Sequence, residues 1–148
     1  MAILYEYYDT GDDSDASIYG VNWVSQTFTP VLAHKIEEVR IYCWRDLGGS
    51  PGTVTVSVRA TDVNGKPTGA DLVSGTFDGN TAPNGAGAVD WVTTTFTTPY
   101  ALTAATKYAI VVRATTGDIN NAINWRSDFV SPTVGSQVAS NDSGVTWG

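Results

Sequence analysis

Hydrophobic and polar residues alternate along most of this chain, which is the pattern of β-strands with one buried face. The clearest stretch places Val54, Val56 and Val58 on one face of a strand and polar side chains on the other. The Asn64-Gly65 pair that follows predicts a tight hairpin, because such turns require the positive φ angles that these residues adopt readily. Helical periodicity is almost absent, so the fold is expected to be all-β.

The same alternation predicts further strands separated by turn residues. They lie at residues 22–29, 35–45, 71–77, 89–96, 107–114 and 123–126. Short strands in this number, with turn signals between them, are typical of an antiparallel two-sheet jelly-roll β-sandwich. The strand at 107–114 is nearly all apolar, so we expect it at the centre of a sheet.

Two segments lack periodicity and are rich in turn-forming residues. Residues 78–88 and 128–142 are therefore predicted to be long surface loops, where binding functions concentrate. A chain of 148 residues suits one domain with one core. Within it, residues 1–17 are expected to form an N-terminal arm or edge strand followed by an acidic loop.

The composition argues against several classes of partner and compartment. The net charge of −7, with no cluster of Lys and Arg, would repel phosphate backbones and anionic lipids, so we expect neither a nucleic acid nor a membrane partner. Cys43 is the sole cysteine and is expected to be a small core residue without a disulfide. Residues 1–9 have no basic or long apolar region, so neither a signal peptide nor an anchor is predicted.

No arrangement of residues forms a catalytic motif. His34 is the single histidine and no serine in a nucleophile-elbow motif accompanies it. Glu37 and Glu38 are adjacent in a predicted strand, so their carboxylates point to opposite faces and cannot act as a pair. The chain is therefore predicted to be non-catalytic and to require no cofactor.

The acidic run at residues 11–15 suggests a metal site. Clustered carboxylates and backbone carbonyls suit a hard cation such as Ca²⁺, with Asp12, Asp13 and Asp15 as candidate ligands. Asp118 and its neighbouring asparagines form a weaker candidate. The run lacks the spacing of an EF-hand, and an acidic loop without any ion is the simpler interpretation.

Aromatic residues suggest a binding face. Tyr42 and Trp44 lie opposite the predicted core residues of their strand, and Trp91 lies opposite the apolar face of another. Such rings can stack against sugars, and Trp125-Arg126 can add a clamp for a glycan. Two alternatives stay open at this point, which are packing in or around the core and an interface between subunits.

Several segments together carry a family resemblance. They are residues 26–30, 39–45, 50–62, 107–114 and 124–126. They resemble a family of jelly-roll β-sandwich domains that is common in bacteriophage virion proteins and in genomes of uncultured microbes, with related modules appended to extracellular proteins. The resemblance runs from about residue 19 to residue 147, and the activities of this family are mostly unknown.

The resemblance implies an assembly function. Members of the family continue past the Ser-Gly-x-Thr-Trp element into a further strand, whose place residues 3–8 or a neighbouring subunit would take here. We therefore expect a non-catalytic virion structural or decoration protein, on the virion surface, that docks on a capsid or forms a homo-oligomer. The residues expected in the docking arm are Ile3, Leu4, Tyr5, Tyr7 and Tyr8. The alternative is a carbohydrate-binding module or adhesin domain of a fibre or extracellular protein, which would hold a polysaccharide.

Overall fold

Nine β-strands make up the fold in the part of the chain that this computed structural model describes, residues 3–11, 13–127 and 135–148. The strands are β1 (Ser14–Ile18), β2 (Trp23–Phe28), β3 (His34–Arg45), β4 (Thr53–Thr61), β5 (Pro67–Asp78), β6 (Asp90–Leu102), β7 (Tyr108–Arg113), β8 (Ile123–Ser127) and β9 (Gln137–Ser140). Two short 3-10 helices, η1 (Gly79–Thr81) and η2 (Ala86–Ala88), interrupt the loop between β5 and β6.

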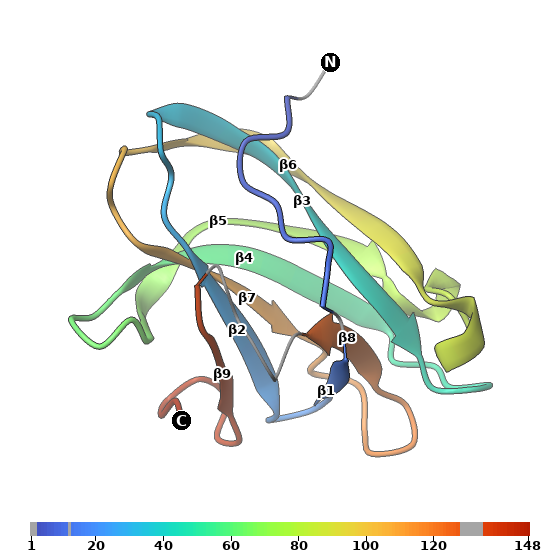
Figure 1. The fold of residues 1–148 in the computed structure, drawn as a ribbon. Coiled ribbons are helices and arrows are strands. Elements are labelled where there is room, and N and C mark those ends of the chain that lie inside the picture. Colours follow the sequence, from blue (N-terminus) through green and yellow to red (C-terminus); the bar gives the residue numbers. More distant parts are fainter. Residues whose placement is uncertain (1–2, 12, 128–134) are drawn as a thin grey trace.

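The strands form two antiparallel sheets, and the protein is a β-sandwich (Figure 1). A four-stranded sheet has the order β1-β8-β3-β6, and a five-stranded sheet has the order β5-β4-β7-β2-β9. The predicted central position of β7 is confirmed. The edge strands β5 and β6 approach so closely that a Cβ atom on Gly75 would lie 2.7 Å from the carbonyl oxygen of Thr95, so only glycine fits there without a shift of the backbone.

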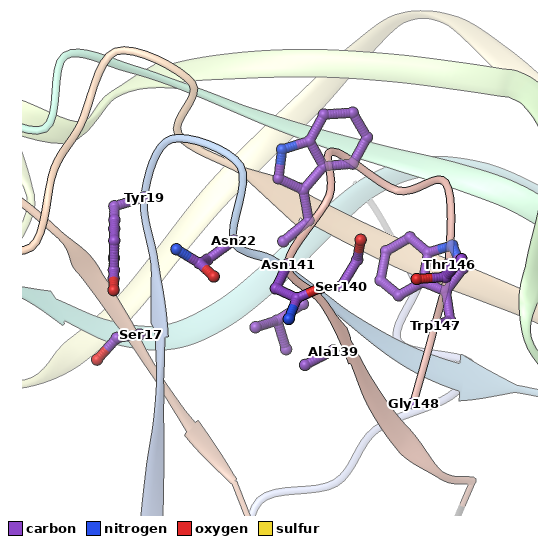
Figure 2. A pocket seen from close by; sticks show the side chains of 11 residues that line it. Ser17, Tyr19, Asn22, Ala139, Ser140, Asn141, Thr146, Trp147 and Gly148 are labelled. Carbon is purple, nitrogen blue, oxygen red and sulfur yellow. The ribbon is translucent and has the colours of Figure 1, made fainter.

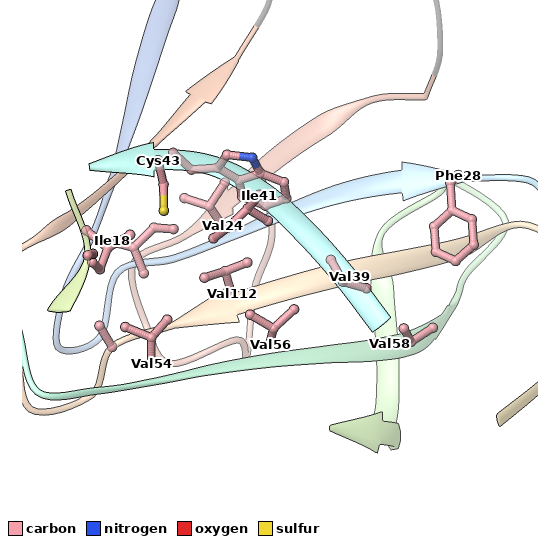
Figure 3. Packing of buried hydrophobic residues seen from close by; sticks show 14 of the residues in the cluster. Ile18, Val24, Phe28, Val39, Ile41, Cys43, Val54, Val56, Val58 and Val112 are labelled. Carbon is pink, nitrogen blue, oxygen red and sulfur yellow. The ribbon is translucent and has the colours of Figure 1, made fainter. Parts of the chain in front are cut away.

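The inward-facing side chains of both sheets form one hydrophobic core (Figure 3). Each of its fully packed members is at most 8% exposed, and they include Ile18, Val24, Phe28, Val39, Ile41, Cys43, Val54, Val56, Val58, Val112, Ile123 and Trp125. Burial raises the pKa of the Cys43 thiol to about 12, so this cysteine stays a neutral thiol and packs as a small apolar side chain, as predicted.

The hairpin between β4 and β5 is longer than the Asn64-Gly65 pair predicts. The connection spans residues 62–66, and only Gly65 in it has a positive φ, of 78°. The carboxylate of Asp62 accepts hydrogen bonds from the backbone N–H groups of Asn64 and Lys66, each at 2.9 Å. The aspartate side chain therefore organises this turn, and a two-residue turn is not needed.

Two strands lie where the sequence predicts loops. β1 occupies part of the predicted acidic loop, because Ala16 and Ile18 face inward while Asp15 and Ser17 face outward. β9 lies within predicted loop 128–142 and pairs with β2 at the edge of the five-stranded sheet. Residues 3–8 form no strand, so of the two forms expected for this segment, an arm or an edge strand, the structure has the arm. In short strands the alternation of apolar and polar residues covers too few positions to be recognised in the sequence.

Candidate functional site

The outer face of the four-stranded sheet brings together three of the predicted aromatic residues. Tyr42 and Trp44 alternate with the core residues of β3, and Trp91 on β6 lies directly opposite Tyr42 in the strand register. The ring centroids of Tyr42 and Trp91 are 5.2 Å apart with an interplanar angle of 39°. Trp91 is 45% exposed, so the rings form one aromatic surface that solvent can reach.

Asp15 orients one side of this surface. Its Oδ1 accepts a hydrogen bond of 3.0 Å from the indole N–H of Trp44, and its Oδ2 lies 3.1 Å from the guanidinium of Arg126. Asp15 is paired with Arg126 across β1 and β8. The two contacts restrain the Trp44 ring and match the charge of Arg126, a role for Asp15 that its sequence context did not suggest.

The face continues along β3 and β6 with polar residues. Arg40 binds Glu38 through two hydrogen bonds to one carboxylate oxygen, at 3.1 and 2.8 Å. Thr93 and Thr95 lie opposite Arg40 and Glu38 in the register. Since each of the two arginines on this face has a carboxylate partner, the surface carries aromatic and hydroxyl groups with balanced charge. We name this surface, formed by residues 15, 38, 40, 42, 44, 91, 93, 95 and 126, the aromatic face.

Trp125 does not belong to the aromatic face, so its prediction as a binding residue is wrong. It is 8% exposed and packs in the core, while Arg126 points outward. Adjacent residues of a strand point to opposite faces of the sheet. Trp125 and Arg126 therefore could not have acted together on one surface, and the sequence already carried that signal.

The N-terminal arm, residues 3–8, lies against the start of β3. The ring of Tyr5 stacks on His34 with centroids 3.8 Å apart and an interplanar angle of 7°. Glu6 lies 3.4 Å from Nε2 of His34, whose Nδ1 is 2.9 Å from the carbonyl oxygen of Leu32. The sole histidine thus anchors the arm to the start of β3.

The structure describes two of the three predicted calcium ligands, Asp13 and Asp15. Asp12 lies outside the described residues, and Asp15 already binds Trp44 and Arg126. Asp13 is exposed. Within residues 3–11, 13–127 and 135–148, no group of three or more His, Cys, Asp or Glu side chains could hold a metal ion. A calcium site stays a prediction without a preformed ligand cluster in this part of the chain.

The second acidic candidate is a closed turn. Oδ1 of Asp118 accepts hydrogen bonds from the backbone N–H of Asn120 at 2.8 Å and from the side-chain amide of Asn121 at 2.9 Å. These hydrogen bonds lower the pKa of the Asp118 carboxyl, the bond from Asn120 most of all. The side chains of Asp118 and Asn121 therefore have a structural function in the loop between β7 and β8.

In comparisons with known proteins, no protein-family model and no curated protein matches this chain. The resemblance to virion domains therefore stays a prediction. In the described ranges, no helix is long and apolar enough to cross a membrane.

Proposed function

We propose that this domain is a non-catalytic carbohydrate-binding module whose binding surface is the aromatic face. The observation that carries the proposal is the convergence of Tyr42, Trp44 and Trp91 on one sheet face, with the Trp44 indole held in place by Asp15. Ligand binding orders the side chains that it contacts, which costs conformational entropy. A ring whose orientation is already restrained loses little entropy in this step, so a restrained set of rings suits ligand binding.

The chemistry of the face fits a neutral polysaccharide. The C–H groups on one side of a pyranose ring carry partial positive charge, and the faces of aromatic rings carry partial negative charge. The hydroxyl groups of the sugar can exchange hydrogen bonds with Thr93, Thr95 and the charged pairs at the edge of the rings. Because both arginines are paired with carboxylates, the face lacks an excess of positive charge for a polyanionic glycan.

Replacement of Trp44 and Trp91 by alanine tests this function. We expect each single variant to weaken binding about tenfold, because aromatic anchors carry much of the binding energy of such surfaces. Retardation in native gels that contain xylan, mixed-linkage β-glucan, glucomannan or hydroxyethylcellulose gives the measurement. The unfolding midpoint of the Trp91→Ala variant should change little, since Trp91 is 45% exposed.

The matched control is Tyr7→Ala, which removes an aromatic residue that is 63% exposed but lies on the N-terminal arm. This variant should be retarded like the unmodified chain. The proposal is wrong if none of the four glycans retards the unmodified chain, or if the Trp44→Ala/Trp91→Ala double variant is retarded to the same extent.

A second candidate function is a virion structural or decoration protein that docks through the N-terminal arm, as the family resemblance implies. The observation that favours it is the exposure of apolar side chains there, with Ile3 70%, Leu4 68% and Tyr7 63% exposed. Burial of such residues against a capsid or another copy stabilises by about 25 cal/mol per Å² of apolar area. The two functions are compatible in a virion fibre that binds glycans on its host, or in an extracellular adhesin.

Deletion of residues 2–9 tests the docking arm. We expect the intact chain to form an oligomer and the shortened chain to be a folded monomer. Its thermal stability should fall only slightly, because residues 3–8 lie outside both sheets and the deletion removes only their contacts with the fold, such as those of Tyr5 and Glu6 with His34. Light scattering over a range of concentrations measures the mass. The triple variant Ile3→Ser/Leu4→Ser/Tyr7→Ser should behave like the deletion.

Val63→Ser is the control for the arm, because Val63 is fully exposed on the β4–β5 hairpin. It should leave the oligomer intact. A monomeric intact chain, or a shortened chain of unchanged oligomeric mass, would contradict self-assembly through the arm.

A further inference from the structure

A pocket of about 510 Å³ lies at the side of the sandwich where β1, β2 and β9 approach the C-terminal turn. Figure 2 shows Ser17 and Tyr19 on one side of it and Thr146 and Trp147 on the other, with Asn22, Asn141 and Ser140 between them. Its volume is within the range of about 300–1,000 Å³ that is usual for small-molecule sites. β9 was not predicted, so nothing in the sequence indicated this pocket.

The side chains that line the pocket are aromatic and polar but uncharged. Tyr19, Trp23 and Trp147 supply aromatic walls, and amides and hydroxyl groups supply the polar positions. None of the 11 residues that line the pocket has an acidic or basic side chain, although the chain has 23 such residues. The charged groups behind this lining already have partners. Arg59 and Arg113, which lie over the Trp23 ring, are paired with Asp71, and the Asp142 carboxylate binds Ser140 and Thr146. The side chains of the lining therefore offer no unpaired charge to an ionic ligand, whereas a neutral polar ligand needs none.

The polar side chains of the pocket fall into two groups. The hydroxyl group of Ser17 donates to Asn124. Those of Ser140 and Thr146 both donate to Asp142, so all three hydroxyl groups are already engaged. By contrast, the side chains of Asn22, Asn141 and Tyr19 have no hydrogen-bond partner within the described residues. Two amides and one phenol therefore remain available to a ligand in the pocket.

The walls that carry these groups are well braced. The carboxylate of Asp142 accepts from Thr146 Oγ1 at 2.6 Å and from the backbone N–H of Thr146 at 2.8 Å. These two hydrogen bonds, followed by that from Ser140, lower the pKa of Asp142 to about 2. Gly148 exchanges two backbone hydrogen bonds of 2.9 Å with Ala139, and the Trp23 indole N–H donates to the carbonyl oxygen of Gly20 at 3.1 Å. The pocket is thus largely preformed at neutral pH.

We infer that this pocket binds a neutral sugar residue, such as a free hexose or the end of an oligosaccharide, through the amides of Asn22 and Asn141 and the phenol of Tyr19. Amides and phenols both donate to and accept from hydroxyl groups, which are the polar groups of a neutral sugar. The aromatic walls contact its C–H groups. The inference stands on the lining of the pocket and does not require that the aromatic face binds glycan.

Indole ¹H–¹⁵N spectra of the full chain test the inference, because the chain has five tryptophans and each gives one signal. Trp→Phe variants assign the signals. Titration with glucose, galactose, mannose and N-acetylglucosamine should shift the signals of Trp23 and Trp147 saturably for at least one sugar. Glucuronate and galacturonate should shift them less. The Trp125 signal is an internal reference from the core.

Alanine variants then identify the polar contacts. Asn22→Ala and Asn141→Ala should each weaken the binding of the responding sugar about fivefold, the loss expected for one uncharged hydrogen bond. Asn120→Ala removes an exposed asparagine outside the pocket and should bind like the unmodified chain. The inference is overturned if no neutral sugar shifts Trp23 and Trp147, if uronates bind better, or if the two pocket variants bind normally.

The same spectra separate the two proposals. Shifts confined to Trp44 and Trp91 would support the aromatic face and overturn the pocket assignment. Shifts confined to Trp23 and Trp147 would support the pocket and count against the aromatic face as a site for those sugars.

Discussion

Trp125→Ala should destabilise the domain by about 3–5 kcal/mol, the usual cost of removing a large aromatic side chain from a core. Trp125 is 8% exposed and belongs to the buried cluster between the sheets. It lies opposite Cys43 in the pairing of β8 with β3, so its loss leaves a cavity where the two sheets meet. A small domain has a total stability of only about 5–15 kcal/mol. Urea unfolding followed by far-ultraviolet circular dichroism measures the loss.

The control for this prediction is Trp91→Ala. Trp91 is 45% exposed on the aromatic face, so its removal should cost much less, about 1 kcal/mol or below. If Trp125→Ala does not fold, Trp125→Phe keeps most of the volume and should give a measurable intermediate loss. Equal losses at Trp91 and Trp125 would contradict the assignment of these two residues to opposite faces.

Asp71→Asn should also destabilise the domain strongly, by about 2–3 kcal/mol. Asp71 on β5 binds Arg59 through Oδ1 at 2.7 Å and Arg113 through Oδ2 at 2.5 Å. The two guanidinium groups lie 5.7 and 5.2 Å from the ring centre of Trp23. Substitution would leave both cations, each at most 16% exposed, without their carboxylate. The expected loss is below the about 3–5 kcal/mol of a fully buried pair, because Asp71 retains some solvent contact.

The effect of Asp71→Asn should depend on pH. Burial raises the pKa of the Asp71 carboxyl, but hydrogen bonds from Arg113 and Arg59 outweigh burial, so its pKa lies below its ordinary value. The unfolded chain therefore binds a proton at a higher pH than the folded one does. The stabilisation is complete above the unfolded pKa of about 3.9 and is lost as the pH falls through the folded value.

Urea midpoints of the unmodified chain and of Asp71→Asn should accordingly differ most near neutral pH and converge in acid. An equal difference at neutral pH and well below the unfolded pKa would contradict this assignment. Arg45→Lys is a suitable comparison, because Arg45 is bound to the carbonyl oxygens of Ala82 and Gly49 and, among the residues that the structure describes, to no carboxylate. Its effect should show no such convergence.

The alternation in β3 shows how much of the candidate site was readable from the sequence. It separates Val39, Ile41 and Cys43, which are all buried, from Tyr42 and Trp44, which face outward. Alternation reports the two faces of a strand because it is a local property of an extended backbone. Trp125 and Arg126 are neighbours in a strand, so their side chains point to opposite faces of the sheet. This alternation alone would have excluded one of the two from the aromatic face.

The strands that the sequence missed are those with weak local signals. β1 contains Asp15 and Ser17 on its outer side, which made the segment resemble a loop, and β9 has only four residues. Both are edge strands of their sheets. Their strand conformation is stabilised by pairing with β8 and β2, far away in the sequence, and no local pattern reports such pairing.

The sequence by itself determined the all-β class, most of the strands and which side of each strand is apolar, because these depend on residues next to one another in the chain. The tertiary structure alone decided that Tyr42 meets Trp91, that Asp15 holds Trp44, and that Asn22 and Asn141 face one pocket. Those contacts depend on which strands become neighbours and in what register. Burial of the whole core selects that arrangement, and a single stretch of sequence does not contain it.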